Sequence, residues 1–566
     1  MRNKTRKHLC CLISVLALPT LVLAQDRAEP DVLRAIEQDA RNGAINASDA
    51  SLLALRAVFD RSALPERYHN LEYKPPRCAT SILKAARSNL DALDDTTKAE
   101  IEELILGFFP CNNAGFSFHL DSPTHPVSVH YETGADAGEA QAALGFLEDA
   151  WDFQVGQLGF TAPLLDQGGC GTNGNLDLYL DRGSDTAYTL DVAGNPSTSW
   201  DDFSVFMVID PGLFGGDLLE TTVHHEFNHA CQAADDWWEV GAAFESTATL
   251  IEEFVDDTIN YYVDTIADFN ALTRRPYEHN DDYVSFFMYG ASLQLLFYYE
   301  HLMGQDATFL GDYWRETRSQ ARGCYCQGAR NEPDTLDALS VVLRDRAGVS
   351  YQDALIEFSR WRWFVGSNDD GAHFSEGASW PDSVQVSPTR TLNASSLPSS
   401  SNVNNGPFPN GASYIVINNT TGAFGPLCIS FTPTTSFEAH VETLAVGASG
   451  TWTTHDASAG PFGVDLTGVT TLVLKVLHLP ASGYDPDFIP STPGRFRLDF
   501  EIPGTCAIPM PCTGDCDDSG AVDFNDLIAM LFEFGNSGDA RCDADLSGTV
   551  EFNDLISALF AFGPCQ

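Results

Sequence analysis

Basic residues are scarce in this sequence. Only 31 Lys and Arg stand against 79 Asp and Glu among 566 residues, which gives a formal net charge of −48 at pH 7. Nucleic acid and anionic membrane surfaces repel such a chain unless a basic patch compensates, and the sequence has no such patch. We therefore expect no nucleic-acid partner, and we attribute most of the acidity to a solvating surface.

Long apolar runs are also missing, apart from one near the N-terminus. The run from Leu9 to Ala24 follows a basic segment without acids and ends at Val22-Leu23-Ala24 before Gln25. These are the features of a secretory signal peptide, and the run is short for a membrane anchor. We expect residues 1–24 to be a cleaved signal peptide and the mature protein to be secreted or held at the cell surface, with no membrane span.

Cysteine usage agrees with export. Of 14 cysteines, Cys10 and Cys11 lie in the predicted signal peptide, which leaves an even number for disulfide pairing. The Cys-x-Cys pair at 324–326 could instead hold a metal, but it has no companion ligands beside it. Connectivity does not follow from spacing. The candidate pairs are Cys78 with Cys111, Cys324 with Cys326 or a third partner, and Cys516 with Cys542.

Composition divides the exported chain into four segments, which predicts a multidomain protein. Residues 25–112 have helical spacing and form either a removed propeptide or a structural N-terminal region. Residues 113–382 mix strand and helix patterns and predict an α+β domain. Residues 383–505 carry alternating apolar runs among Ser, Thr, Asn, Gly and Pro, which is typical of an antiparallel β-sandwich. Residues 512–566 contain an internal duplication and predict a small α domain.

The α+β segment opens with a strand, a helix and two further strands. Alternation predicts strands at Val127–Tyr131 and Leu176–Leu180, and a third short strand at Phe203–Ile209. Helical periodicity covers Ala137–Leu158 between the first two. Helices then dominate from Leu218 to about Phe364.

A two-histidine metal motif lies in the helix predicted from Leu218 to Gln232. Residues four apart share one helix face, so His225 and His229 can offer two imidazole nitrogens to one ion while Glu226 lies beside it. This HExxH pattern predicts one zinc ion. His224 points about 100° away round the helix, and we expect it to be exposed or to support the ligands from behind.

The third zinc ligand must come from the next helix, where three glutamates compete. Glu239 follows His229 closely and leaves little chain for the return. Glu252 lies two turns past Glu245, so it shares that face but would overshoot the ion. Small residues beside Glu245 permit the close helix packing that brings a ligand inward. We therefore predict Glu245, with Glu239 and Glu252 as the alternatives.

The predicted ligands imply a hydrolytic mechanism. Three protein ligands leave one zinc position open for water, and Glu226 would accept a proton as that water attacks a peptide carbonyl. The developing oxyanion needs a further donor, for which Tyr289 is preferred over Tyr261 and Tyr262. The sequence has no Gly-x-Ser-x-Gly elbow and no phosphate-binding glycine loop that would offer a competing chemistry.

The duplicated tail carries two calcium-loop patterns, from Asp515 to Gly535 and from Asp543 to Gly563. Each copy has oxygen ligands at alternating positions, a glycine at position 6 and a carboxylate at position 12, as calcium requires. One amphipathic helix follows each loop. The repeats predict about two calcium ions. The predicted ligands are Asp515, Asp517, Ser519, Asp523 and Asp526 for the first ion and Asp543, Asp545, Ser547, Glu551 and Asp554 for the second.

The stretch from Val127 to about Phe364 resembles bacterial secreted metalloproteases of the gluzincin type. The resemblance rests on the HExxH run, on Glu245-Ser246-Thr247-Ala248-Thr249 and on Tyr289-Gly290-Ala291-Ser292. It implies a zincin-like metallopeptidase fold in which an edge strand, here Val205–Ile209, binds the extended substrate. The gap before the third ligand is shorter than in better-known gluzincins. The implied zinc ligands are His225, His229 and Glu245, with Glu226 as general base.

The tail resembles the type I dockerin repeat over residues 515–563. Position 12 is Asp in both copies, as suits that family, whereas Ser519 and Ser547 stand at position 5, where Asp or Asn is usual. Phe524-Asn525 and Phe552-Asn553 differ from the usual pair at the partner-contacting positions. The resemblance implies either a docking segment or a self-contained calcium-stapled module that caps the chain.

Together these patterns predict an exported zinc metalloendopeptidase that acts on protein or peptide substrates. The main alternative is a non-catalytic extracellular adhesion or binding protein, in which the zincin domain is degenerate and the sandwich and tail make the contacts. A hydrolase that acts on glycans is a third possibility, and it rests only on the enzymes that usually carry dockerins.

Overall fold

The computed structural model describes most of the chain after residue 30. It covers residues 31–564 except 74, 89, 91–92, 94, 108, 113–114, 167–168, 172, 213–214, 257, 280–285, 319–332, 421–424, 448–449, 481–492, 503–505, 507–513, 517–520, 536–541, 543 and 545–548. The signal-peptide prediction, Cys324 and Cys326 therefore lie outside the described residues. The same holds for the predicted calcium ligands Asp517, Ser519, Asp543, Asp545 and Ser547.

The N-terminal region is helical, as its spacing predicts. Side chains cap the N-termini of the first two helices. Asp31 accepts a hydrogen bond from the Arg34 amide at 3.0 Å, and Asn46 accepts one from the Asp49 amide at 2.8 Å. Apolar residues of this region belong to the same continuous core as the sheet that follows. The helices are α1 (Val32–Arg41), α2 (Ala47–Phe59), α3 (Glu66–His69), α4 (Thr80–Ser88) and α5 (Asp95–Gly107).

A mixed five-stranded sheet with the order β1-β2-β3-β5-β4 forms the next layer. Strands β2, β3 and β5 run parallel, while β1 and β4 pair antiparallel at the two edges. The predicted edge position of Val205–Ile209 is therefore wrong, because β4 pairs with β5 and takes the edge. The strands are β1 (Phe118–Asp121), β2 (Val127–Tyr131), β3 (Leu176–Leu180), β4 (Ala187–Gly194) and β5 (Phe203–Ile209).

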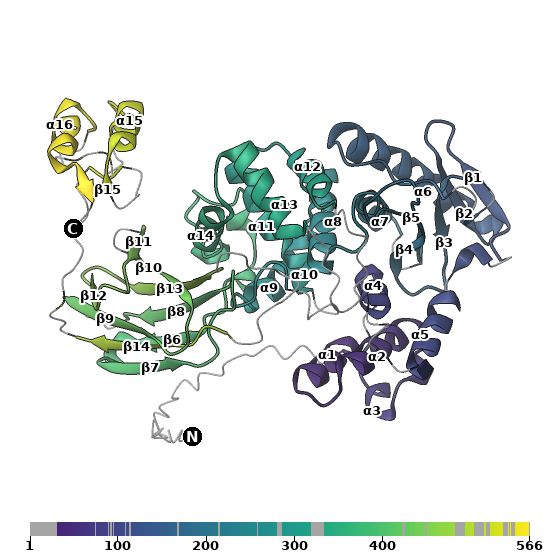
Figure 1. Cartoon of the computed structure of the whole chain (residues 1–566), viewed down its shortest axis with the longest axis horizontal. Helices are drawn as coiled ribbons and strands as arrows, with labels where there is room; N and C mark the ends of the chain where they lie inside the picture. The colour runs from purple at the N-terminus through teal and green to yellow at the C-terminus, as the bar shows by residue number, and fades with distance from the viewer. Residues whose placement is uncertain are drawn as a thin grey trace, which may run out of the picture.

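Two helices pack on this sheet and lead to the metal motif. α6 (Ala137–Ala150) contacts β2, and α7 (Asp217–Ala233) contacts β4, β5 and α6 (Figure 1). A short turn then reverses the chain into α8 (Gly241–Val255), which packs on α7 and is almost wholly buried. The motif helix is thus held between the sheet and α8.

Helices continue after α8 and surround it. At Gly290 a Cβ atom would lie 2.3 Å from the Thr265 carbonyl oxygen, so only glycine permits the close approach of α10 to α9. The helices are α9 (Tyr261–Ala271), α10 (Phe287–Gly290), α11 (Ser292–Phe297), α12 (Phe309–Glu316), α13 (Thr335–Val342) and α14 (Tyr351–Trp361).

Two sheets follow and face each other across their own apolar core. Their strand orders are β11-β10-β13-β8-β6 and β12-β9-β14-β7. Nearly all neighbours pair antiparallel, as predicted, but β6 runs parallel to β8. The strands are β6 (Arg390–Asn393), β7 (Ser399–Val403), β8 (Ala412–Asn418), β9 (Pro426–Pro433), β10 (Glu438–Val446), β11 (Trp452–His455), β12 (Phe462–Asp465), β13 (Thr471–Leu479) and β14 (Phe496–Glu501).

The duplicated tail forms a small unit with a core of its own. Its helices α15 (Phe524–Phe532) and α16 (Phe552–Ala561) contact each other, and short strands β15 (Ala521–Val522) and β16 (Gly563–Pro564) pair antiparallel. Each helix begins with a capping box. Repeated sequence therefore gives repeated local structure, with one helix per copy.

Disulfides are present in three places within the described residues. The predicted pair Cys516–Cys542 is confirmed, and Cys428–Cys506 joins β9 to the end of the sandwich segment. The predicted pair of Cys78 with Cys111 is wrong, because Cys111 pairs with Cys170 and Cys78 is a free, buried thiol. Among the helices that the structure describes, none combines the length and the apolar character that crossing a bilayer requires.

Candidate metal centre

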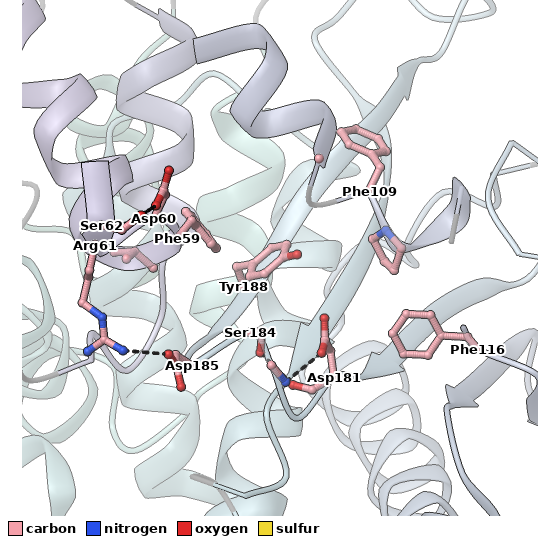
Figure 2. Close-up of a pocket in the computed structure, with 14 residues that line it drawn as sticks. Phe59, Asp60, Arg61, Ser62, Phe109, Phe116, Asp181, Ser184, Asp185 and Tyr188 are labelled. Carbon is pink, nitrogen blue, oxygen red and sulfur yellow. Dashed lines mark hydrogen bonds and ion pairs between the residues drawn. The ribbon is translucent and has the colours of Figure 1, made fainter. Parts of the chain in front are cut away.

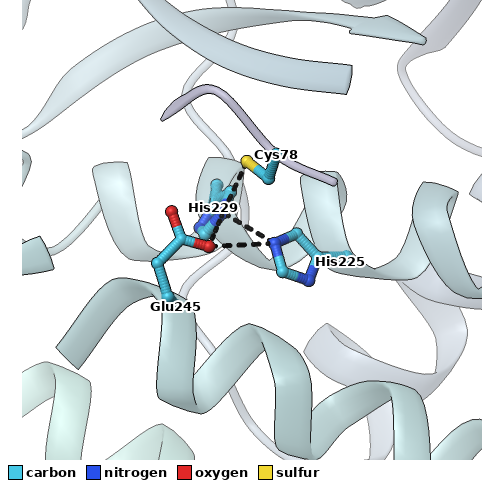
Figure 3. A group of neighbouring side chains, drawn as sticks. All are labelled: Cys78, His225, His229 and Glu245. Atoms are coloured by element: carbon cyan, nitrogen blue, oxygen red, sulfur yellow. Dashed lines mark hydrogen bonds and ion pairs between the residues drawn. The ribbon is translucent and has the colours of Figure 1, made fainter. Parts of the chain in front are cut away.

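Four side chains of metal-ligating type meet in the interior (Figure 3). His225 and His229 project from α7, Glu245 projects from α8, and Cys78 comes from the segment just before α4. One donor atom from each lies within 4.8 Å of the others, and each residue is at most 2 % exposed. Two consecutive helices and a segment whose Cys78 lies 151 residues before His229 therefore converge on one point.

The donor atoms are arranged around a common centre. The two imidazole Nε2 atoms lie 3.1 Å apart. Glu245 Oε2 lies 3.3 Å from His225 Nε2 and 3.6 Å from His229 Nε2, and Cys78 Sγ lies 3.5 Å from His229 Nε2. Two nitrogens, one oxygen and one sulfur are a donor set that suits zinc.

Hydrogen bonds behind the histidines turn their Nε2 atoms toward this centre. His225 Nδ1 lies 2.6 Å from Glu252 Oε1, and His229 Nδ1 lies 2.8 Å from Gln232 Oε1. Gln232 is fixed in turn by Asn228 at 2.7 Å. Carboxylate and carbonyl partners of this kind orient metal-binding imidazoles and raise their basicity. Glu252 thus holds a ligand from behind.

The carboxylates of Glu245 and Glu252 stabilise positive charge on the His225 imidazole. Burial alone would lower the pKa of His225, but hydrogen bonds to Glu245 and Glu252 raise it to about 10. Burial would likewise raise the pKa of Glu245, but His225 and His229 hold it well below its ordinary value. Ser81 donates a hydrogen bond to the second oxygen of Glu245.

Glu239, the other alternative for the third ligand, lies outside the group. It is buried in the turn between α7 and α8, where its carboxylate accepts from the Val240 amide at 2.6 Å. Its backbone carbonyl accepts from Lys84 Nζ at 3.2 Å. Its carboxylate is therefore used within the turn.

Glu226 is buried beside the ligands on α7. Its Oε2 atom accepts a hydrogen bond from Thr189 of β4 at 2.7 Å. Burial raises the pKa of Glu226 above its ordinary value, although His229 and His225 act to lower it. A carboxylate with a raised pKa next to imidazole ligands suits proton transfer.

The tyrosine candidates differ in position. The Tyr289 hydroxyl donates to the backbone carbonyl of Cys78 at 3.0 Å, and its ring stacks on His225 with the centroids 6.1 Å apart. Tyr261 is 41 % exposed, and the Tyr262 hydroxyl donates to Glu376 at 3.0 Å. Of these three tyrosines, Tyr289 is the one that contacts the metal-ligand group, which comprises Cys78, His225, His229 and Glu245.

His224 behaves differently from both expectations. It is neither exposed nor bonded to a ligand, and neither of its ring nitrogens has a hydrogen-bond partner among the described residues. The ring lies edge-on to Phe153, and burial lowers the pKa of His224 to about 4. The face of α7 that carries His224 therefore packs against Trp151–Gln157, the helical segment after α6, and is closed to solvent.

Sequence reasoning missed the residues that come from outside the two helices. Cys78 lies 151 residues before His229, and the sequence-based prediction pairs it with Cys111 in a disulfide. Thr189 lies on β4, which is not among the strands predicted from the sequence. No local pattern links these residues to the HExxH motif, because their proximity arises only from tertiary packing.

The described calcium-loop residues of the tail are bound mainly to backbone. Asp526 accepts from the amides of Cys516 and Asp523, each at 2.6 Å, and Asp554 accepts from the amide of Glu551 at 2.6 Å. Asp526 and Asp554 are fully buried, and Asp515 is 9 % exposed. These carboxylates hold the turns that precede α15 and α16.

Two further sites do not compete with this centre. Asp166, Cys170 and Asp177 also lie close together, but the Cys170 sulfur is bonded to Cys111. A cavity of about 290 Å³ lies where the N-terminal helices meet the turn before β4 (Figure 2). Arg61 and Asp185 form an ion pair at 3.1 Å at its rim, and none of the four metal-type ligands lines it.

No protein-family model matches this sequence, and a search of curated proteins finds no match. The likeness to gluzincins and dockerins therefore rests on the motifs alone. What the chain does is inferred from the geometry of the metal-ligand group.

Proposed function

We propose that this protein is an exported zinc-dependent endopeptidase. The observation that carries the proposal is the convergence of His225 Nε2, His229 Nε2 and Glu245 Oε2, next to Glu226 and beside the edge strand β4. A buried set of this kind in a chain with disulfides favours a metallohydrolase that works outside the cytoplasm.

The residues present fit a divalent cation. Two imidazole nitrogens that face each other at 3.1 Å, with a carboxylate oxygen at 3.3 Å, direct lone pairs to one point. Within the described residues, no Lys or Arg forms an ion pair with Glu245. A small ion with nitrogen and oxygen ligands at about 2.0–2.2 Å satisfies all three donors.

The residues around the ligands provide the remaining parts of a peptidase mechanism. A bound zinc ion supplies Lewis acidity, which makes a water at the site more acidic and polarises a peptide carbonyl. Glu226 accepts the proton of that water through Oε1, because Thr189 holds Oε2. As the water oxygen bonds to the carbonyl carbon, the Tyr289 hydroxyl would donate to the developing oxyanion. Glu226 would then pass the proton to the amide nitrogen as the C–N bond breaks.

Strand β4 provides the place for an extended peptide. It lies at the edge of the sheet, so its outer backbone groups are not used by another strand of that sheet. Thr189 belongs to this strand and contacts Glu226, which places the edge beside the proposed base. An unfolded or extended protein segment is therefore the substrate class that we propose.

The test is cleavage of casein by zinc-loaded protein, with Glu226→Gln as the informative variant. Because Cys78 lies among the ligands, both chains also carry Cys78→Ala, so that the thiol cannot mask activity. We expect Cys78→Ala to cleave casein and the added Glu226→Gln to abolish cleavage with zinc retained. Glu438→Gln, an exposed change on β10, is the matched control and leaves cleavage unchanged. Equal cleavage with and without Glu226 contradicts the proposal.

A second role, for the tail, is favoured by its exposed apolar side chains. Matching positions of the two copies are exposed, and Phe532 and Phe560 reach 85 % and 89 %. We propose that the loops bind two calcium ions and that the helices dock on a partner protein, which is also how the non-catalytic alternative would act. Calcium titration with thermal unfolding tests this, and an unchanged tail stability contradicts it. The exposed set is Phe524, Ile528, Leu531, Phe532 and Phe534 with Phe552, Ile556, Leu559, Phe560 and Phe562.

A further inference from the structure

We propose that Cys78 keeps the metal centre latent, with its thiolate as the fourth ligand and residues 76–80 in the place of the substrate. This proposal rests on the proposed peptidase function and adds its regulation. A catalytic zinc site keeps one position open, whereas a fourth protein ligand closes it. The chain thus carries its own inhibitor in the region before the catalytic sheet.

The sulfur is placed as a ligand. Cys78 Sγ lies 3.5 Å from His229 Nε2 and within 4.8 Å of the donor atoms of all three other ligands. The residue is 2 % exposed and forms no disulfide. A thiolate is a stronger zinc ligand than water, so a bound ion would hold it in preference to the attacking water.

The same segment occupies the edge of β4. The Ala79 amide donates to the Ala187 carbonyl at 2.8 Å, and the Thr189 amide donates to the Thr80 hydroxyl at 2.8 Å. Cys78 also pairs with Ala187 as an isolated parallel bridge. These backbone groups of the edge strand are the ones that an extended substrate would need.

The proposed oxyanion donor is engaged as well. The Tyr289 hydroxyl donates to the Cys78 carbonyl at 3.0 Å. A peptide carbonyl of the chain itself therefore takes the hydrogen bond that a substrate carbonyl would receive. The segment therefore blocks three features on which the proposed reaction depends. Its sulfur takes the open metal position, its backbone takes the edge of β4, and its Cys78 carbonyl takes the Tyr289 hydroxyl.

Side chains on both sides of Cys78 bind the segment to α8 and to the turn before it. Arg77 forms an ion pair with Glu252, the carboxylate that also holds His225. Ser81 donates to Glu245, and Lys84 donates to the Glu239 carbonyl at 3.2 Å. Two of these contacts reach the metal-ligand group: Ser81 bonds Glu245 directly, and Arg77 bonds the carboxylate that orients His225.

The experiment compares the full chain with Cys78→Ala and with Cys231→Ala. Cys231 is the matched control, because it is also a free, buried cysteine but lies outside the ligand group. Each protein is loaded with Co²⁺ for absorption spectra and with Zn²⁺ for cleavage of casein. We expect a thiolate-to-cobalt charge-transfer band in the wild type and in Cys231→Ala, and its loss in Cys78→Ala. We expect cleavage to rise by about tenfold or more only in Cys78→Ala.

The outcomes separate this proposal from the proposed function. If Cys78→Ala retains the band, or if the wild type cleaves casein as fast as Cys78→Ala, latency is overturned while the peptidase stands. If Cys78→Ala binds metal but cleaves nothing, both are overturned, and four protein ligands then describe a structural site. Should Cys78→Ala fail to fold, X-ray absorption of zinc-loaded wild type decides. One sulfur at about 2.3 Å supports the proposal, and a shell without sulfur overturns it.

Discussion

Two buried clusters of charged side chains differ in the source of their positive charge. Between α14 and the sandwich, the Glu442 carboxylate forms ion pairs with Lys475 and Arg360. In the metal-ligand group, Glu245 faces two imidazoles, and no Lys or Arg pairs with it among the described residues. The first cluster contains its own cations, whereas the second directs several lone pairs to one point.

The two clusters also differ in the pKa values of their members. Burial would raise the pKa of Glu442, but Lys475 holds it well below its ordinary value, and burial lowers the pKa of Lys475 to about 8. The Lys475 ammonium also donates to Ser359 of α14 at 2.7 Å, so the cluster ties the helix to the sheet. In the metal-ligand group, the positive charge opposite Glu245 lies instead on an imidazole, because hydrogen bonds to Glu245 and Glu252 raise the pKa of His225 to about 10.

The largest expected effect concerns the proposed base. Glu226→Gln in the Cys78→Ala chain should lower the casein cleavage rate by about 10³-fold, because the amide cannot accept a proton. The zinc content should stay unchanged, since Glu226 is not one of the four ligands. Initial rates with metal analysis of the same sample check this, and a loss below about tenfold would contradict the assigned role.

The next effect should appear at the junction with the sandwich. Lys475→Ala removes one of the two cations that pair with the buried Glu442 carboxylate and should lower the free energy of unfolding by about 3 kcal/mol in urea titrations. The double change Glu442→Gln with Lys475→Met removes the carboxylate as well, leaves Arg360 paired with Glu357, and is the control, with a smaller loss. Zinc content should not respond to either change. If Lys475→Ala were to release zinc, the two clusters would not be independent.

A pH dependence should come from His455 in the sandwich. Burial lowers its pKa to about 4 against the opposing influence of Glu442, and Thr443 lies within 2.7 Å of its Nε2 atom. The unfolded chain binds a proton below its ordinary pKa, so stability is lost as the pH falls from about 6.5 to about 4. His455→Gln should reduce that loss by at most about 3 kcal/mol, as urea midpoints across this range would show. An identical pH profile for both chains would refute the assignment.

The smallest effect is stabilisation by the metal. Zinc at 100 times its dissociation constant should add about 2.7 kcal/mol to the stability of the native state. His229→Ala should abolish this gain, which thermal unfolding with added zinc or chelator measures. The control His440→Ala changes a histidine of the sandwich outside the ligand group and should keep the full gain.

The parts of the site that the sequence predicted are those set by local periodicity. The predicted helix from Leu218 to Gln232 agrees with α7 to within one residue at each end, and it places His225 and His229 on one face. Strands β2, β3 and β5 have the predicted bounds. Glu245 reaches the group because its neighbours Ser246, Thr247 and Ala248 are small and buried, and α8 packs closely on α7.

The parts that could not be predicted depend on long-range packing. Strand β4 includes Thr189 and Asp191 among its buried positions and shifts register between Asp191 and Ala193, so its pattern is irregular. The even number of exported cysteines predicts disulfides but does not say which cysteines pair, so the sequence does not show that Cys78 stays free. Only the packing of α4 against β4 and α8 brings this thiol to the histidines.

The most direct test of the central claim is the zinc content of the purified protein. Elemental analysis of wild type and of the double variant His225→Ala/His229→Ala should give one zinc per chain for the first and none for the second, with both chains folded by circular dichroism. Wild type that takes up no zinc, or a double variant that keeps a full equivalent, would contradict a metal centre at these residues.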